Sequence, residues 1–147
     1  MVWLKTLHVI GAIVWLGNFV VTGVWSARAF ASRRPELRAF AVREILFTDA
    51  VFTLAFGSAV VASGIALAAS ERIALWATLW TRAALEIVIA AGIVWLAVLL
   101  PLEIGMRRQI AAGSSKLGRS FVWWNVAGWA VTLALFCVVY IMFQKPA

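Results

Sequence analysis

Few residues in this 147-residue sequence could do chemistry. It contains one histidine, His8, and one cysteine, Cys137. A zinc site needs three or four nitrogen, sulfur or carboxylate ligands, which these two residues do not supply. No serine stands in the sharp strand-to-helix turn that exposes a nucleophile. The sequence therefore excludes zinc-dependent hydrolases and serine hydrolases. Haem remains the metal group that His8 could bind, because a single axial histidine can hold its iron.

Four polar side chains stand in or beside apolar stretches: His8, Arg82, Glu86 and Tyr140. If each stretch is a helix that rises 1.5 Å per residue, then His8, Glu86 and Tyr140 each lie roughly 12 Å from the centre of their helix, toward its outer end. Arg82 lies one turn farther out. Ionisable residues inside a membrane usually face the bundle interior and pair. We therefore predict that the four form a cofactor-binding cluster. A simpler alternative makes Arg82 and Glu86 an i, i+4 ion pair and His8 an interfacial hydrogen-bonding residue.

A second polar set falls toward the opposite ends of the same stretches: Asn18, Asp49, Glu103 and Asn125. Hydrogen bonds between membrane helices contribute about 0.6 to 2 kcal/mol each, so we predict a structural polar cluster. Asp49 needs a partner inside the membrane, and Arg107 is the expected one. A proton path would need carboxylates or histidines between the two sets, and the sequence offers none, so a proton channel is not expected.

The elements that position these side chains are membrane-spanning helices. Hydrophobic residues make up 65% of the chain and charged residues 13%, against about 25% charged in soluble domains. Stretches without Asp, Glu, Lys or Arg cover residues 6–27, 50–70, 87–102 and 120–144. A bilayer core requires about 20 apolar residues as helix, and open β-structure is excluded there. We predict an all-α integral membrane four-transmembrane-helix bundle, a single domain over residues 1–147 with spans at about 4–27, 46–70, 80–104 and 120–143.

Charge indicates the orientation of these spans. Residues 26–44 and 105–119 contain five and four basic residues, nine of the thirteen in the chain. The positive-inside rule places both segments in the cytoplasm and both termini on the outer side. The distribution of tryptophan agrees, with Trp25, Trp123 and Trp124 expected at the inner interface. The same basic segments could also contact anionic lipids. An alternative in which the first span is a cleaved signal peptide is disfavoured, because its uncharged run exceeds the usual apolar region of about 7–15 residues.

The second span is rich in small residues: Ala55, Gly57, Ala59, Ser63 and Gly64. Small residues let membrane helices approach closely. We predict that this set packs within the bundle, with a dedicated oligomer surface as the alternative. Pro101 is expected to bend the third span.

Several motifs resemble a known family. The chain begins with Trp3-Leu4-Lys5-Thr6-Leu7-His8-Val9-Ile10 and Trp15-Leu16-Gly17, places Pro101 at the end of the third span, and closes with Tyr140-Ile141-Met142-Phe143-Gln144-Lys145-Pro146. Over its whole length it resembles the predicted integral membrane proteins of family DUF2269. It is also similar to the wider group of HemJ-type protoporphyrinogen oxidases and CopD-like proteins. This resemblance implies four helices, a haem-linked role for His8 and a match of Asn125 to the asparagine of the fourth span. Arg82 stands near the position of a lysine in those oxidases, and their additional histidines are missing.

These features predict a non-catalytic accessory or assembly subunit of a larger membrane complex, respiratory or photosynthetic. The alternative is a haem-linked membrane oxidoreductase of the HemJ type, with His8 as axial ligand of haem b and Arg82 holding a propionate. The expected partners are membrane lipids and either other membrane subunits or further copies of the chain, and no nucleic acid. The expected location is the bacterial inner (plasma) membrane, with thylakoid or organelle membranes as alternatives.

Overall fold

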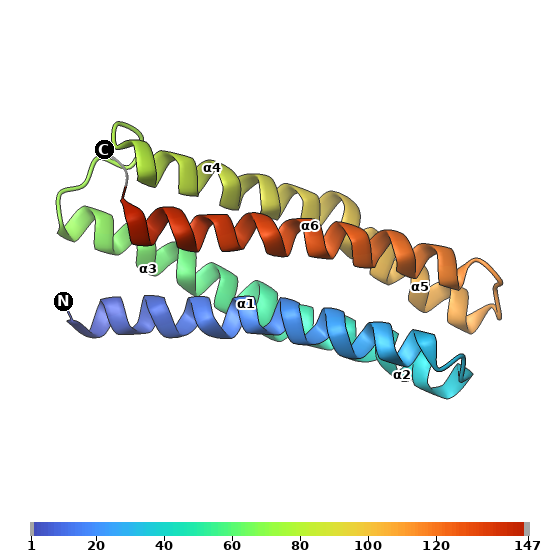
Figure 1. Cartoon of the computed structure of the whole chain (residues 1–147). Helices are drawn as coiled ribbons and strands as arrows, with labels where there is room; N and C mark the ends of the chain where they lie inside the picture. Colours follow the sequence, from blue (N-terminus) through green and yellow to red (C-terminus); the bar gives the residue numbers. More distant parts are fainter. Residues whose placement is uncertain (1, 146–147) are drawn as a thin grey trace.

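The computed structural model describes residues 2–145, and over that range the chain consists of helices and their connections, without strands (Figure 1). The elements are α1 (Val2–Ala31), α2 (Pro35–Thr48), η1 (Asp49–Phe56), α3 (Gly57–Ser70), α4 (Leu79–Val94), η2 (Trp95–Leu99), α5 (Leu100–Ala111) and α6 (Leu117–Gln144). Because α2, η1 and α3 follow one another without a break, as do α4, η2 and α5, they make four long helices.

Each long helix is apolar enough and long enough to cross a membrane. The candidate spans are Val2–Ala31, Pro35–Ser70, Leu79–Ala111 and Leu117–Gln144. The predicted all-helical fold with four spans is therefore confirmed. The helices extend beyond the predicted spans because charged residues continue them past the apolar stretches. The predicted domain limits at residues 1 and 147 lie outside the described residues.

Two segments, η1 and η2, are π-helical, wound more loosely than the α-helices on either side. Pro101 follows η2 by two residues. Its ring has no N–H and crowds the carbonyl of the residue four positions earlier, Ala97, which lies in η2. A π-helical segment thus lies directly before Pro101, and the predicted bend of the span stays a prediction.

The up-and-down course of the chain gives the molecule two different ends (Figure 1). The turns at residues 32–34 and 112–116 lie together at one end, which we call the basic end after the nine Lys and Arg residues in and around these turns. The start of α1, the end of α6 and the connection at residues 71–78 lie at the other, which we call the terminal end. The common placement of the two basic segments agrees with the sequence analysis, and the side of the membrane that each end faces stays a prediction.

The core is concentrated toward the basic end. Here α2 packs on α1 and α5, and α6 packs on α1 and α5. The buried side chains are large, among them Ile45, Met106 and Phe121, and the Phe121 ring stacks on Phe30 at a centroid distance of 3.7 Å.

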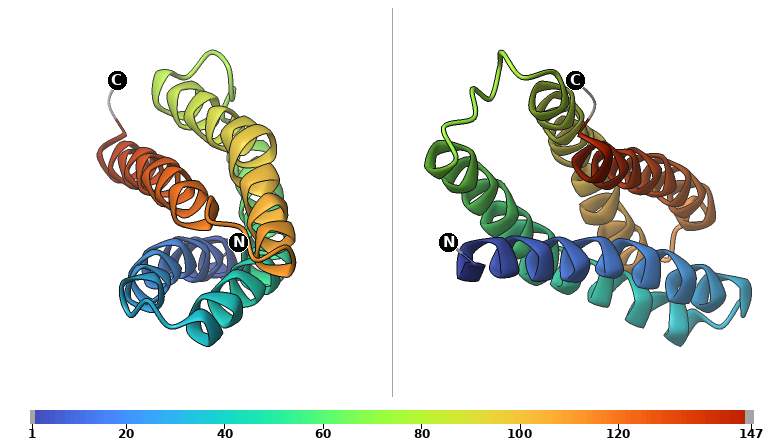
Figure 2. Two further views of the ribbon diagram at one scale, coloured as in Figure 1. Left: turned by 90° about the vertical axis from the view of Figure 1, so that its right-hand side faces the viewer. Right: turned by 60° about the vertical axis from the view of Figure 1, so that its left-hand side comes forward.

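Toward the terminal end the bundle separates into two pairs of helices. Within the described residues α3 contacts α1 and η1, and α4 contacts α6 and η2, but α3 and α4 do not contact each other. The separation of the two pairs is visible in Figure 2. Several buried residues of this half are small, namely Ala68, Ala84 and Ala91.

Candidate functional site

His8 lies in the interface between α1 and α3. Its Nδ1 atom is 3.0 Å from the carbonyl oxygen of Val60 and 3.0 Å from the hydroxyl oxygen of Ser63. A Cβ atom built on Gly64 would lie 3.0 Å from its Cε1 atom, so a larger residue there would force the imidazole ring to shift. The half-buried His8 is therefore hydrogen-bonded to α3 and packed closely against it.

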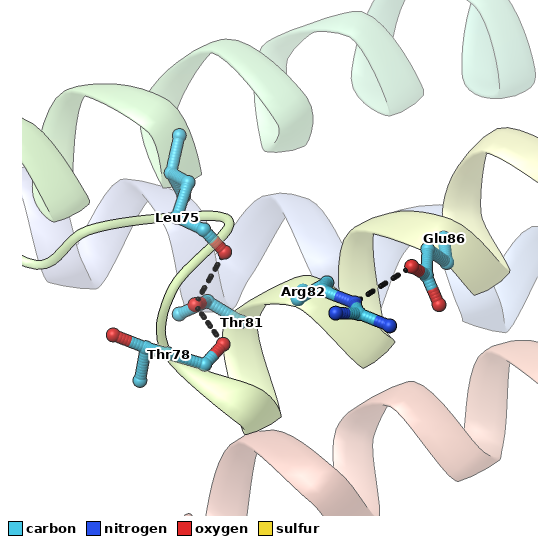
Figure 3. Close-up of polar contacts among 5 residues, drawn as sticks. All are labelled: Leu75, Thr78, Thr81, Arg82 and Glu86. Carbon is cyan, nitrogen blue, oxygen red and sulfur yellow. Dashed lines mark hydrogen bonds and ion pairs between the residues drawn. The ribbon is translucent and has the colours of Figure 1, made fainter.

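Arg82 and Glu86 pair with each other at the start of α4 (Figure 3). The Arg82 Nε atom donates to the Glu86 Oε1 atom at 2.9 Å, and both side chains are 55% exposed. One residue earlier, the buried Thr81 hydroxyl donates to the carbonyl oxygens of Leu75 and Thr78 at 2.8 and 2.9 Å, which fixes the connection leading into the helix (Figure 3).

The structure does not gather the predicted cofactor set into one pocket. Helices α1 and α4 make no contact within the described residues, so His8 is separated from Arg82 and Glu86. Tyr140 is 65% exposed on α6. A shared role for the four in binding a cofactor stays a prediction without geometric support.

Asp49, in contrast, is buried and fully engaged. It is 6% exposed at the first position of η1. Its Oδ1 atom accepts a hydrogen bond of 2.8 Å from the Thr53 hydroxyl, and its Oδ2 atom accepts one of 2.7 Å from the indole N–H of Trp95 at the start of η2. This second bond joins the two π-helical segments. Arg107 is exposed, and none of the ion pairs within residues 2–145 contains Asp49, so the prediction of an Arg107 partner is wrong.

Glu103 is the most deeply buried acid, with no exposed surface. Its Oε1 atom accepts a hydrogen bond of 2.8 Å from the indole N–H of Trp124. Trp124 is itself only 7% exposed, so it packs in the core, whereas its neighbour Trp123 is 64% exposed. The predicted depth of both at the inner interface stays a prediction. The remaining oxygen of Glu103, Oε2, is buried without a hydrogen-bond donor.

A small cavity connects the whole second polar set. The volume of this cavity in which the centre of a water molecule could lie is about 20 Å³. The polar residues that line it are Asn18, Thr22, Asp49, Glu103, Asn125 and Thr132. The Nδ2 atoms of Asn18 and Asn125 are buried without acceptors among the described residues. The sequence thus identified the members of this cluster, and the structure adds a cavity at their centre.

The small residues of the second span divide between two faces of its helix. Gly57 lies against Trp15 and Gly64 against His8, since a Cβ atom at either glycine would come within 3.0 Å of these rings. Ser63 faces His8 as well. These three residues confirm packing within the bundle. Ala55 and Ala59 are instead exposed.

One charged contact closes the terminal end of the α1–α3 pair. The Lys5 ammonium group forms an ion pair with Glu71, the residue directly after α3. The hydrogen bond and the positive charge of Lys5 lower the pKa of the Glu71 carboxyl from its ordinary value. Burial acts weakly in the opposite direction.

Sequence reasoning missed the two tryptophans that bind the acids. An indole N–H is a donor without an acceptor, and it usually finds a partner when buried. Trp95 lies at the midpoint of the long apolar helix Leu79–Ala111, and Trp124 directly follows the exposed Trp123. The two acids were the signal that could have identified these tryptophans. Asp49 and Glu103 lie within predicted membrane helices, so each required a hydrogen-bond donor from a neighbouring helix.

Among residues 2–145 no three His, Cys, Asp or Glu side chains are grouped closely enough to hold a metal ion. Searches of curated proteins and of solved structures gave no match, so the similarity to HemJ-type and CopD-like proteins stays a prediction. The model of one family matches nearly the whole chain, residues 2–146, and its description agrees with the four apolar helices of the fold. The chain therefore belongs to the family of predicted integral membrane proteins DUF2269.

Proposed function

We propose that the protein is a non-catalytic accessory or assembly subunit that packs against another membrane polypeptide through the exposed face of α3. The observation that carries this proposal is a row of exposed small residues that begins at the end of η1 and continues along α3. The row consists of Ala55, Ala59, Ala62 and Ala66. Their spacing of three and four residues places them on one side of the helix, one above the other.

Small residues have a particular meaning on a membrane helix. Lipid chains solvate leucine and valine as well as a protein interior does, so apolar character does not drive helices together. Close backbone approach does, and it requires small side chains. Among residues 2–145, α3 packs on α1 and η1 only, and Gly57, Ser63 and Gly64 on its opposite side face α1. The alanine row is thus left for a second helix from outside the chain.

The polar groups support a structural role rather than catalysis. Arg82 pairs with Glu86, His8 bonds to α3, and Asp49 and Glu103 accept hydrogen bonds from tryptophans. The hydroxyl of Ser63, which lies 3.0 Å from His8 Nδ1, also donates a hydrogen bond of 3.0 Å to the Val60 carbonyl oxygen of its own helix. A respiratory or photosynthetic complex of the bacterial inner membrane is the assembly we propose for it, with lipids and membrane subunits as its neighbours.

Site-specific photo-crosslinking in intact cells tests this proposal. A photoreactive residue at Ala59 is expected to give one discrete adduct with a defined polypeptide, identified by mass spectrometry. The matched control is Ala90, an alanine equally exposed on α4. Adducts from two differently tagged copies of the chain would identify the partner as a second copy. Equal, diffuse labelling at both positions, together with a lone monomer in mild detergent, would overturn the proposal.

A haem-linked oxidoreductase is the second candidate, and one observation favours it. A histidine ligand usually donates its second ring N–H to an oxygen. His8 Nδ1 lies 3.0 Å from the Val60 carbonyl oxygen, which fixes the ring with Nε2 as the free nitrogen. The other residues do not fit this group, because Arg82 is bound to Glu86 on a helix that does not contact α1.

A visible spectrum distinguishes the two candidates. Protein purified from haem-replete cells, oxidised and then reduced with dithionite, is expected to be colourless if the subunit proposal holds. A Soret band that disappears in His8→Ala would favour the haem-linked candidate instead.

A further inference from the structure

Two buried acids meet near the basic end without a basic partner. Asp49 and Glu103 are 6% and 0% exposed, and both line the same small cavity. None of the ion pairs formed within residues 2–145 includes either. Two ionised carboxyl groups that share a water-poor site repel each other strongly unless one is protonated or a cation lies between them. This pair therefore requires a bound positive charge, either a proton or a cation.

The surrounding donors do not supply that charge. Trp95 and Thr53 donate to Asp49, and Trp124 donates to Glu103, and all three are neutral. They satisfy three of the four carboxyl oxygens. The fourth, Glu103 Oε2, is buried and receives no hydrogen bond from a donor.

The groups that face the pair from every packed element are uncharged. Helix α1 contributes Asn18 and Thr22 to the cavity, η2 contributes Leu99, and α6 contributes Trp124, Asn125 and Thr132. No lysine or arginine lines it. Amide and hydroxyl oxygens of these residues can join the carboxyl groups as ligands, since each asparagine amide presents an oxygen or a nitrogen according to how it is turned.

The size of the cavity restricts the occupant. The cavity volume of about 20 Å³ is enough for one or two water molecules or ions of similar size. Calcium takes 6–8 oxygen ligands, and magnesium usually retains several waters, so neither fits the donors and the space. A small monovalent cation fits both.

The backbone supplies an independent indication of a site. Asp49 is the first residue of η1, Trp95 is the first residue of η2, and their hydrogen bond joins the two. Single widened turns inside α-helices occur frequently at functional sites. Here two of them, in separate helices, meet at one of the two acids.

We infer that the cavity between α1, η1, α5 and α6 binds one Na⁺ ion, held by Asp49 and Glu103 with oxygens of Asn18 and Asn125. The ion compensates the charge of one carboxylate, a proton kept on the pair compensates the other, and the ion ties together four segments of the chain. This inference does not depend on the proposed subunit role, because it concerns residues other than the His8 contacts and the alanine row.

Binding of radioactive ²²Na⁺ to the purified full-length chain in detergent tests the inference directly. Wild-type protein is expected to bind one ion per chain, with saturation. Thermal unfolding provides the second readout, since a ligand of the folded state raises Tm. At constant ionic strength and neutral pH, Tm is expected to rise from choline chloride to sodium chloride, and to rise less with potassium chloride because of the small cavity.

Variants identify the ligands. Asp49→Asn and Glu103→Gln are expected to abolish ²²Na⁺ binding and the sodium-dependent rise in Tm. Glu86→Gln, which alters an exposed acid outside the cavity, is expected to retain both. If the first two variants fail to fold, Asn125→Ala provides a milder change that should weaken binding at least several-fold. Absence of ²²Na⁺ binding by the wild type, with the same Tm in sodium and choline chloride, would overturn the inference and leave a proton alone between the acids.

Discussion

The two ends of the bundle are held together by different means. At the basic end all four long helices contribute large buried side chains, and buried acids are bonded to tryptophans from neighbouring helices. At the terminal end the helices remain in two pairs, and in the described part of the chain α3 does not contact α4. The α1–α3 pair is closed there by glycines, by His8 and by an exposed ion pair.

This difference shows what binds helices in a lipid-like environment. Apolar surface is present along the whole length of each helix, so it does not decide where helices meet. Specific hydrogen bonds, stacked rings and close backbone approach do. The basic end has all three, so we expect it to carry most of the stability, whereas the terminal end depends on close approach within one pair.

The largest effect is expected from Trp124→Ala. The substitution leaves a cavity in the core and removes the donor from the buried Glu103 carboxyl. Truncation of a buried tryptophan costs about 3–5 kcal/mol. Unfolding of the purified protein in detergent measures the change.

The adjacent tryptophan provides the control for that measurement. Trp123 is 64% exposed, so Trp123→Ala is expected to change stability by less than about 0.5 kcal/mol. Equal losses in the two variants would contradict the assignment of Trp124 to the core and remove the distinction between the ends.

A smaller loss is expected at the terminal end from Gly64→Leu. The Cβ atom alone would come within 3.0 Å of the His8 ring, so a leucine forces α1 and α3 apart. Overpacking of this kind costs about 1–3 kcal/mol. Gly17→Leu is the matched control, because no atom lies within 4 Å of a Cβ atom there. The comparison fails if Gly17→Leu is as harmful as Gly64→Leu in the same unfolding assay.

Trp95→Phe tests whether the hydrogen bond between the two π-helical segments stabilises the fold. Phenylalanine retains most of the ring but loses the N–H that donates 2.7 Å to Asp49. A buried acceptor left without its donor costs about 1–3 kcal/mol, and we expect the lower part of this range because Thr53 still donates to the same carboxyl. Trp76→Phe, at an exposed position, should be nearly silent. A silent Trp95→Phe would show that the bond between η1 and η2 is not needed to hold the two helices together.

The sequence predicted the fold well because a long uncharged stretch has few alternatives to a membrane helix. It also predicted the members of the inner polar cluster, since Asn18, Asp49, Glu103 and Asn125 fall at similar depths and line one cavity. Depth alone does not determine which side of a helix a residue occupies. That is why His8 and Arg82, although predicted at similar depths in the membrane, lie on helices that make no contact among residues 2–145.

The angular position of each residue around its helix axis also explains the other differences between the predictions and the structure. Trp123 and Trp124 are adjacent in sequence, yet about 100° of helical turn between them places one outside and the other against Glu103. The same rotation separates Gly57 and Gly64, which face α1, from Ala55 and Ala59, which do not. Asp49 received its donor from Trp95 rather than from Arg107 because the fold turns the indole toward it.

The smallest effect is expected from the ion pair at the terminal end. Lys5 lowers the pKa of Glu71 in the folded protein below the ordinary value of 4.5, so the ionised carboxyl favours the folded state. Its contribution is present above the pKa of the unfolded chain and is lost as the pH falls through the lower, folded pKa. In Glu71→Gln the thermal stability should therefore fall less between neutral pH and acid pH than it does in the wild type. Lys5→Met should reproduce the altered pH dependence, because it removes the cause of the shift. At neutral pH both variants should lose less stability than Trp95→Phe, since exposed ion pairs contribute little. Identical pH profiles for the wild type and both variants would show that this end is held by the glycine contacts alone.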